Sequence, residues 1–290
     1  RIFKRLMDVS NQYVQPGQLI TKHQGFLRGH GTMIVDGNLV AIVSGFVLQT
    51  NKLISVIPLN SRYSGNVADV VVGRVVEVGD KRWKVDVHSR QHAVLHLSSI
   101  HLPGGVQRRR TTEDALQMRD FFVEGDLLSA EVQKLYQDDS LALQTRSLKY
   151  GKLYGGSIII VPQSLIKRSK KHFISLKCGV DVILGNNGYI WVTNTKSEEE
   201  QKMISESEER RTSIKLSPIS SEIRERICRV HNCIEALSRA FVYISAQTVE
   251  ATYNQSVSLG LTVKEMLNDD NIPQLTRYAR AEVSEEIMDS

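Results

Sequence analysis

Hydrophobic and polar residues alternate along residues 67–146, and turn-forming residues interrupt the alternation at short intervals. This pattern predicts five short strands, with one helix inserted between the third and the fourth. The strands are expected at residues 67–78, 82–88, 92–97, 127–136 and 141–146, with tight turns at Gly79-Asp80 and Asp138-Asp139. Thr111, Thr112 and Asp114 form a capping pattern for the inserted helix. Five strands in this rhythm are typical of a small OB-type barrel.

The same alternation predicts which side chains face the barrel interior. Trp83, Val85 and Val87 share one parity and, with Leu95 and Leu97 on the next strand, should form the core. Trp83 has an alternative use as a stacking platform for a ligand, but its parity favours the core. The opposite parity should form a basic and polar outer surface, made of Arg82, Lys84, Asp86, His88 and His96.

Residues 13–62 are punctuated by glycines between short β-rich runs at 39–48 and 52–59, which predicts a small all-β unit. The segment from Gly25 to Gly31 matches neither a P-loop nor a dinucleotide fingerprint. We interpret its glycines as turns and close backbone approaches. Residues 1–12 have few apolar anchors, and they either order on a partner or form a disordered tail.

Residues 148–290 predict a third domain that changes from strands to helices. Strands are expected at 157–161 and, within 182–192, on both sides of the tetrad Gly185-Asn186-Asn187-Gly188. A basic cluster within 164–176 is compatible with a helix, and the charge-rich residues 196–212 with a loop. Apolar residues then recur at three- and four-residue steps from Ile223 to Leu237, which predicts an amphipathic helix. Weaker helical patterns follow at 246–257, 262–267 and 272–287.

Composition narrows the class of partner. The 290 residues carry 37 Lys and Arg against 32 Asp and Glu, a net charge of +5 and a pI near 9.0, which favours an anionic partner. Cys178, Cys228 and Cys233 form no CxxC pair, which indicates a reducing compartment rather than a disulfide framework or a zinc ribbon. No apolar run approaches the roughly 20 residues of a membrane span, so no membrane contact is expected.

Catalytic and metal-binding residues form no clear constellation in the sequence. Metal-dependent hydrolysis needs clustered carboxylates, whereas Asp80, Asp86, Asp138-Asp139 and Asp269-Asp270 are scattered. His88, His92, His96 and His101 are denser, but they lack cysteine or carboxylate support for zinc. We therefore expect no catalytic residue, no metal and no cofactor.

Two pieces of the predicted barrel, Val85-Asp86 and Leu95-His96-Leu97-Ser98, resemble the signature segments of the S1 RNA-binding domain. That family usually carries an aromatic residue on its RNA-facing second strand, where this chain has Lys84. The resemblance therefore implies RNA contact in which phosphate attraction counts for more than base stacking.

A wider set of segments resembles the RNA exosome cap subunits that join an S1 to a KH domain, of the ribosomal-RNA-processing type. The segments are Arg28-Gly-His-Gly-Thr32, Asn51-Lys52-Leu53-Ile54, Lys81-Arg82-Trp83-Lys84-Val85, Leu102-Pro103-Gly104-Gly105, Arg146-Ser-Leu-Lys-Tyr-Gly-Lys-Leu153 and Val182-Ile-Leu-Gly-Asn-Asn-Gly188. The resemblance implies a multidomain, mainly β fold with a C-terminal α+β part. Its expected parts are an N-terminal arm (1–12), a small β domain (13–62), an S1 barrel of the OB fold (63–147) and a KH-like domain with C-terminal helices (148–290).

The same resemblance implies non-catalytic work in a large assembly. Such cap proteins clamp a ring of RNase PH-like subunits and line the entrance through which single-stranded RNA reaches an associated 3'–5' exoribonuclease, in the nucleus, nucleolus and cytoplasm. The expected partners are the ring subunits, the other cap proteins, the exoribonuclease and RNA. The alternative is a free-standing S1/KH factor that binds single-stranded RNA in decay or translation. A nuclease is a third reading, which the scattered carboxylates oppose.

Basic residues at the first hairpin and on the outer face are the best candidates for RNA contact, because OB barrels meet single strands there. Lys81, Arg82 and Lys84 lead this set. The other candidates are His96, Arg90, Arg108, Arg109, Arg110, Arg62, Arg146 and Lys149. The three consecutive arginines have an equal alternative, which is to pair with acidic groups of the ring.

The tetrad Gly185-Asn186-Asn187-Gly188 is the point where resemblance and residue pattern differ. In an RNA-gripping KH domain the GxxG loop clamps backbone nucleotides and joins two helices. Here β-rich sequence flanks the tetrad, so we expect a structural hairpin turn with Asn186 and Asn187 at positions that tolerate positive φ. The flanking strands should present Val182, Leu184, Ile190 and Val192 to a core.

Overall fold

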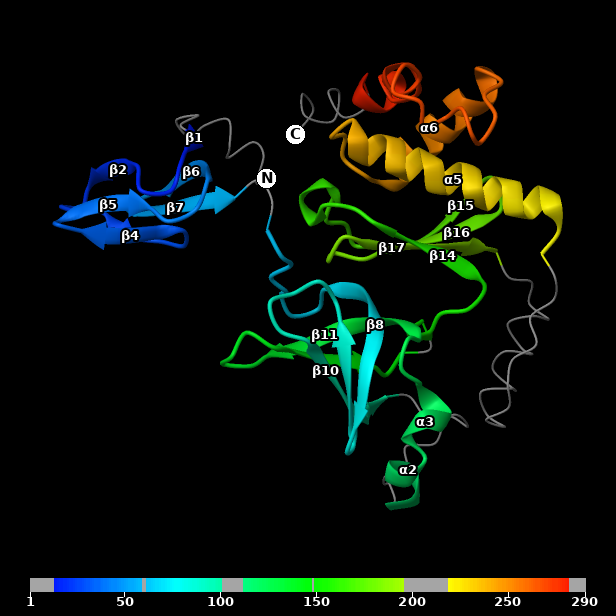
Figure 1. Ribbon diagram of the computed structural model, residues 1–290, viewed down its shortest axis with the longest axis horizontal. Coiled ribbons are helices and arrows are strands. Elements are labelled where there is room, and N and C mark those ends of the chain that lie inside the picture. The colour runs from blue at the N-terminus through cyan, green and yellow to red at the C-terminus, as the bar shows by residue number, and fades with distance from the viewer. Residues whose placement is uncertain (1–12, 59–60, 101–111, 148, 196–218, 282–290) are drawn as a thin grey trace. The chain divides into compact units, whose positions relative to one another are not determined.

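The computed structural model describes residues 13–58, 61–100, 112–147, 149–195 and 219–281 (Figure 1). The chain separates into two units, Arg1–Ser61 and Arg62–Ser290. The architecture is mainly β with helices towards the C-terminus, as the sequence predicts. Among the described residues, no helix is both long and apolar enough to cross a membrane.

The first unit is built from two small sheets. One has the strand order β1-β6-β7-β3 and the other β2-β5-β4. The strands are β1 (Tyr13–Val14), β2 (Leu19–Lys22), β3 (Leu27–Arg28), β4 (Thr32–Val35), β5 (Asn38–Ala41), β6 (Gly45–Thr50) and β7 (Leu53–Pro58). The single β run expected at 39–48 is thus divided between the sheets, because Gly45 starts a new strand against Pro58 of β7. Val14, Leu39, Ala41, Val47, Ile54 and Val56 form its core.

The glycines between Gly25 and Gly31 serve turns and close backbone approaches, as expected. A Cβ on Gly29 would collide with the carbonyl group of Ile54, and Gly31 has a φ of +73°. Strand β3 runs parallel to β7 beside this point. Close packing therefore explains Gly29 and Gly31, and a positive φ of +87° explains Gly25.

The second unit begins with a closed five-stranded barrel. Its strands are β8 (Val70–Gly79), β9 (Arg82–Asp86), β10 (Ala93–Ile100), β11 (Leu127–Leu135) and β12 (Leu141–Thr145). They follow the order β12-β10-β9-β8-β11, pairing of β11 with β12 closes the sheet, and β13 (Gly151–Lys152) extends it. Helices α2 (Thr112–Leu116) and α3 (Met118–Phe121) occupy the predicted insertion. The predicted barrel is confirmed, with strand ends shifted by a few residues.

Trp83 lies in the barrel core, as its parity predicts. Its side chain is 0% exposed, and its Nε1 donates to the Phe122 carbonyl at 3.1 Å. The rings of Phe121 and Phe122 meet the indole edge to face, with centroids at 6.4 and 5.4 Å. Truncating so large a buried side chain typically costs about 3–5 kcal/mol. Trp83 therefore stabilises the barrel core, and its buried ring offers no stacking surface to a ligand.

The rest of the second unit is a four-stranded antiparallel sheet with helices on one face (Figure 1). Its order is β14-β17-β16-β15, with β14 (Gly156–Ile160), β15 (Phe173–Leu176), β16 (Val180–Leu184) and β17 (Tyr189–Asn194). Helix α5 (Ser221–Arg239) packs on this sheet, and α6 (Ala246–Ser258) and α7 (Ile272–Leu275) pack on α5. The predicted inward residues Val182, Leu184, Ile190 and Val192 all belong to the core between sheet and helices.

Helix α5 begins at a serine cap. The Ser220 Oγ accepts the Ile223 N–H at 3.4 Å, an arrangement worth about 1 kcal/mol. Ile227, Val230, Ile234 and Leu237 form its buried face, which follows the predicted apolar stripe. The charge-rich residues 196–212 lie outside the described residues, as do residues 1–12.

Two helical expectations are wrong. The basic cluster within 164–176 forms no helix, because a 3-10 turn, η1 (Gln163–Leu165), is followed by an exposed loop and by β15. This loop has no apolar stripe to bury, so nothing rewards a helix there. Residues 263–267 form turns, and within 272–287 the described helical residues are α7 and 277–281.

The tetrad Gly185-Asn186-Asn187-Gly188 joins β16 to β17 as a hairpin, as expected, but its asparagines do not have positive φ. The positive φ, +91°, falls on Gly188, whose N–H donates to the Gly185 carbonyl at 3.1 Å. This is a turn followed by a left-handed glycine. The expected positive φ of Asn186 and Asn187 was wrong. Local turn rules do not consider distant partners, and the side chains of both asparagines have partners in the barrel.

Asn187 fastens this hairpin to the barrel. Its side chain is buried, at 0% exposure, and its Nδ2 donates to the carbonyls of Val72 at 2.7 Å and Val87 at 3.0 Å. Its Oδ1 accepts the Val72 N–H at 3.3 Å. The Asn187 amide thus supplies hydrogen bonds that these buried backbone groups of the barrel would otherwise lack.

A second set of contacts surrounds Asp69 at the start of the barrel. Its carboxylate accepts from the Tyr63 hydroxyl at 2.7 Å and from Asn186 Nδ2 at 3.0 Å, and Arg168 lies 3.6 Å away. Burial and this carboxylate raise the pKa of Tyr63, so the phenol stays protonated as a donor. An apolar cluster of Val72, Ile183, Tyr189 and Trp191 packs beside these bonds. Barrel and KH-like sheet therefore share one buried junction.

Candidate nucleic-acid interface

Three candidate cations and a histidine come together at the first hairpin of the barrel. The antiparallel register places Arg82 opposite His96 and Lys84 opposite Val94. The hairpin turn is Asp80-Lys81, one residue later than predicted, because Gly79 pairs with Arg82. Lys81 has a φ of +55°, and its carbonyl accepts the Leu97 N–H at 3.0 Å. We call Lys81, Arg82, Lys84 and His96 the barrel face.

The charge of Lys84 is partly compensated. Its Nζ lies 2.6 Å from Glu77 Oε2, and this hydrogen bond lowers the pKa of Glu77. The two side chains are 41% and 56% exposed, so water screens their attraction. A phosphate group can therefore compete for Lys84. Lys81 and Arg82 form no ion pair within the described part of the chain, and Glu77 attracts Arg82 less strongly than it attracts Lys84.

An aromatic residue that the strand pattern did not single out lies beside the barrel face. The Tyr136 hydroxyl is 3.1 Å from His96 Nε2, and Lys134 Nζ lies 4.6 Å from the Tyr136 ring centroid. Lys134 and Tyr136 are two positions apart, so the sequence alone predicts that their side chains lie on the same face of an extended chain. Their closeness to His96 depends on closure of the barrel through β12, which the sequence alone does not locate. An aromatic ring beside cations combines stacking with phosphate attraction.

The remaining candidates do not join the barrel face through any contact of the described residues. Arg90 forms an exposed ion pair with Asp139 at 3.8 Å. The Arg62 carbonyl accepts from Gln163 Nε2 at 3.2 Å, at the junction with the KH-like sheet. Arg146 and Lys149 are exposed on the segment after β12. Arg108, Arg109 and Arg110 lie outside the described residues.

Several carboxylates near the barrel have local structural partners. Asp86 accepts the His88 N–H at 2.9 Å, and Asp138 accepts the Ser140 N–H at 3.1 Å. The Ser140 hydroxyl, which also donates to Asp138, lowers the pKa of that carboxyl group. Among the described residues, no group of three or more His, Cys, Asp or Glu is placed to hold a metal ion.

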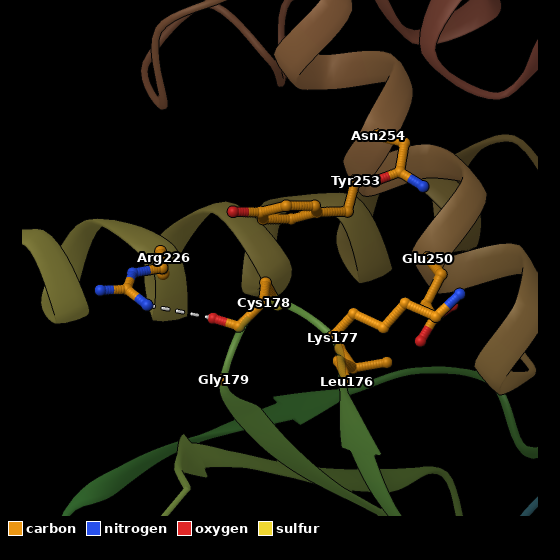
Figure 2. Close-up of a pocket in the computed structure, with 8 residues that line it drawn as sticks. All are labelled: Leu176, Lys177, Cys178, Gly179, Arg226, Glu250, Tyr253 and Asn254. Carbon is orange, nitrogen blue, oxygen red and sulfur yellow. Dashed lines mark hydrogen bonds and ion pairs between the residues drawn. The ribbon is translucent and has the colours of Figure 1, made fainter.

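A hollow of about 430 Å³ lies on the KH-like domain, between the β15–β16 turn and helices α5 and α6 (Figure 2). Arg226 Nη1 donates to the Cys178 carbonyl at 3.2 Å, and Lys177 Nζ lies 3.4 Å from Glu250. Burial raises the pKa of the Cys178 thiol, so its nucleophilic thiolate form is disfavoured at neutral pH. The polar groups of this hollow thus mainly hold the turn against the helices.

Three family models match successive parts of the chain. They are described as "Exosome complex exonuclease RRP4 N-terminal region" for residues 13–50, "RRP4, S1 domain" for 62–134 and "KH domain" for 156–198.

Curated relatives extend the similarity over most of the chain. The exosome complex component RRP4 of Bos taurus is 44% identical over 273 residues, which is 94% of this chain and 90% of the relative. The Schizosaccharomyces pombe component is 45% identical over 276 residues, which is 93% of this chain and 84% of the relative. The Saccharomyces cerevisiae component is 44% identical over 277 residues, covering 85% and 77%. The chain belongs to the RRP4 family of exosome complex components.

Proposed function

We propose that this chain is a non-catalytic, RNA-binding cap subunit of the RNA exosome. It stabilises the RNase PH-like ring and guides single-stranded RNA into the central channel for 3'–5' degradation and processing, including that of ribosomal RNA. The observation that carries the proposal is the barrel face, a set of cations held by strand register on the S1 barrel of an RRP4-family chain. Fixed cations attract phosphates whatever the base sequence.

Within this proposal, Lys81 and Arg82 make the main phosphate contacts and Lys84 shares its charge with Glu77. His96 and Tyr136 add a hydrogen-bonded, partly aromatic edge where a base can rest. Arg62, Arg90, Arg146 and Lys149 extend the contact along the RNA.

The KH-like domain takes a structural part in this proposal. Its tetrad is the place where a KH module would grip nucleotides, but Asn187 is buried against the barrel backbone. A loop that occupies the domain junction is not open to RNA. The structural partners of Asp69, Asp86 and Asp138 likewise support a role without intrinsic nuclease chemistry.

In this proposal, the β domain of residues 13–62 and the KH-like domain of residues 148–290 bind the ring. The S1 barrel of residues 63–147 lines the RNA path. The partners are the RNase PH-like ring subunits, the other cap proteins and an associated 3'–5' exoribonuclease. The protein then works where exosomes work, in the nucleus, nucleolus and cytoplasm.

The native mass of affinity-purified chain tests this function. A tagged chain should elute as a large assembly that contains ring subunits and retains RNA. The isolated chain, incubated with labelled RNA and magnesium or manganese, should release no products. A free monomer that binds RNA without ring subunits would support a free-standing factor instead, and time-dependent cleavage by the isolated chain would contradict the non-catalytic role.

A further inference from the structure

A basic loop that the barrel face does not include lies where the KH-like sheet meets the barrel. Residues 167–171, between η1 and β15, read Lys-Arg-Ser-Lys-Lys, and all five are exposed. We call this segment the junction loop. Four cations in five positions repel one another, so their clustering is unfavourable unless an anion is nearby.

The junction loop is held in place at both ends. The Lys167 N–H donates to the Ile244 carbonyl at 3.2 Å, next to a β-bridge between Ile166 and Ile244. At the other end, the Leu184 N–H donates to the His172 carbonyl at 2.9 Å. Inside the loop, the Ser169 hydroxyl donates to the Lys171 carbonyl at 2.6 Å. A ligand that binds such a loop loses less free energy to ordering than it would on a free chain.

Arg168 ties the loop to the barrel. Its guanidinium lies 3.6 Å from Asp69 Oδ2, and with the Asn66 amide in the orientation that satisfies both groups it also donates to Asn66 Oδ1 at 2.9 Å. Close by in the fold, Gln163 of η1 donates to the carbonyl of Arg62. Arg62, which begins the unit that contains the barrel, and the junction loop of the KH-like domain therefore place exposed cations on either side of the junction between barrel and KH-like sheet.

The charges of the loop are not all used by the fold. Asp69 compensates Arg168, whereas Lys170 and Lys171 make no ion pair within the described part of the chain. The exposed loop also offers no apolar side chain, and protein interfaces depend on a desolvated aromatic or aliphatic centre. A polyanion that needs only fixed cations fits this surface better than a protein does.

We propose that Lys170 and Lys171, with Arg62, contact phosphates of a single-stranded RNA whose other nucleotides lie on the barrel face. This inference rests on the proposed RNA binding by the barrel. It gives the KH-like domain an RNA contact through the junction loop, in place of the tetrad that is buried at the junction.

The test compares full-length variants by their affinity for a labelled oligouridine of about 20 nucleotides, which is longer than the footprint of one OB barrel. Lys170→Gln/Lys171→Gln should bind about tenfold more weakly at low salt. Its log–log salt slope should be smaller by about 1.4, because each lost phosphate contact on a single strand removes about 0.7. An RNA of about 4 nucleotides that is bound on the barrel face should bind parent and variant equally, because the ten-residue strand β8 separates the Lys81-Arg82 hairpin from Asp69 and the junction loop, and so short an RNA cannot reach both.

The matched control is Lys264→Gln/Arg277→Gln, which removes two exposed cations from the helical part of the same domain. This control should bind RNA like the parent. If it loses as much affinity as the junction variant, net charge rather than the junction loop determines binding, and the proposal is wrong. Lys81→Gln/Arg82→Gln separates the inference from the function on which it rests. If that variant loses binding and the junction variant does not, only the inference fails, and a parent chain that binds no RNA overturns both. If the junction variant keeps its RNA affinity but is lost from purified exosomes, the loop contacts an acidic protein surface and the proposal is wrong.

Discussion

Asn187 is the residue on which the junction between barrel and KH-like sheet depends most directly. Its amide donates to two barrel carbonyls and accepts one N–H, with no exposure to water. Asn187→Asp would place a buried carboxylate against the carbonyls of Val72 and Val87. Repulsion and lost donors should lower the free energy of unfolding by about 3 kcal/mol or more. The urea midpoint of the full chain measures this loss.

The control for this change is Asn254→Asp, the same replacement at an exposed position of α6. It should leave the urea midpoint near that of the parent. Equal midpoints for parent and Asn187→Asp would show that the asparagine does not fasten the two domains.

Glu77 is the second informative residue, because it competes with phosphate for Lys84. Removing its charge by Glu77→Gln should free Lys84 and remove one negative charge beside the barrel face. RNA affinity should rise by about threefold at low salt and by less at high salt, where the attraction is screened. Fluorescence anisotropy with labelled RNA checks the change. Asp269→Asn, an equal change of charge on the KH-like domain, should have little effect, and weaker binding by Glu77→Gln would contradict the role of Lys84.

At the scale of the element, helix α5 carries a titrating group on its half-buried side. Burial lowers the pKa of His231 below its ordinary value near 6.5, partly offset by Glu235, and the Nδ1 of His231 lies 3.2 Å from the Ser157 hydroxyl. The folded chain therefore prefers the neutral ring, so this contribution to stability is present above the unfolded pKa. It is lost as the pH falls through the lower folded pKa, because the unfolded chain takes up its proton first.

The replacement His231→Gln removes this titration and keeps a hydrogen-bonding group beside Ser157. Between about pH 7.5 and about pH 5.5, the parent should lose more thermal stability than the variant does. Melting temperatures at the two pH values measure the difference, with the exposed His92→Gln as the control. The same pH dependence in parent and His231→Gln would exclude this histidine as its source.

The elements also differ in how far the sequence could predict them. Strands β8 to β12 were predicted because alternation reports burial on one face, and Trp83 followed from its parity alone. For residues 164–176 the sequence is compatible with a helix and the structure has a loop, because charge does not distinguish a helix from a loop when no apolar stripe is present. The predicted and observed ends of the strands differ because turn-forming residues locate a turn only to within about one residue. The first hairpin, for example, turns at Asp80-Lys81 and not at Gly79-Asp80.

At the scale of the whole molecule, the order of a β unit, a barrel and an α+β domain was predicted, and the junction between the last two was not. Asn187 and Val72 are 115 residues apart in sequence, and Asn186 and Asp69 are 117 apart. No local pattern reports such contacts. The same holds for Tyr136 and His96, which meet only when the barrel closes. Candidate cations were found by their charge, but which of them share a surface required the strand register.

The central claim is that the barrel face binds single-stranded RNA by attracting phosphates. The most direct test is the equilibrium affinity of the full chain for oligouridine and for a mixed-sequence RNA across a salt series, with Lys81→Glu/Arg82→Glu as the variant. We expect the logarithm of the parent's binding constant to fall linearly with the logarithm of salt, similarly for both RNAs, and the variant to lose most of the binding. An affinity that barely changes with salt, or a variant that binds as well as the parent, would contradict the account.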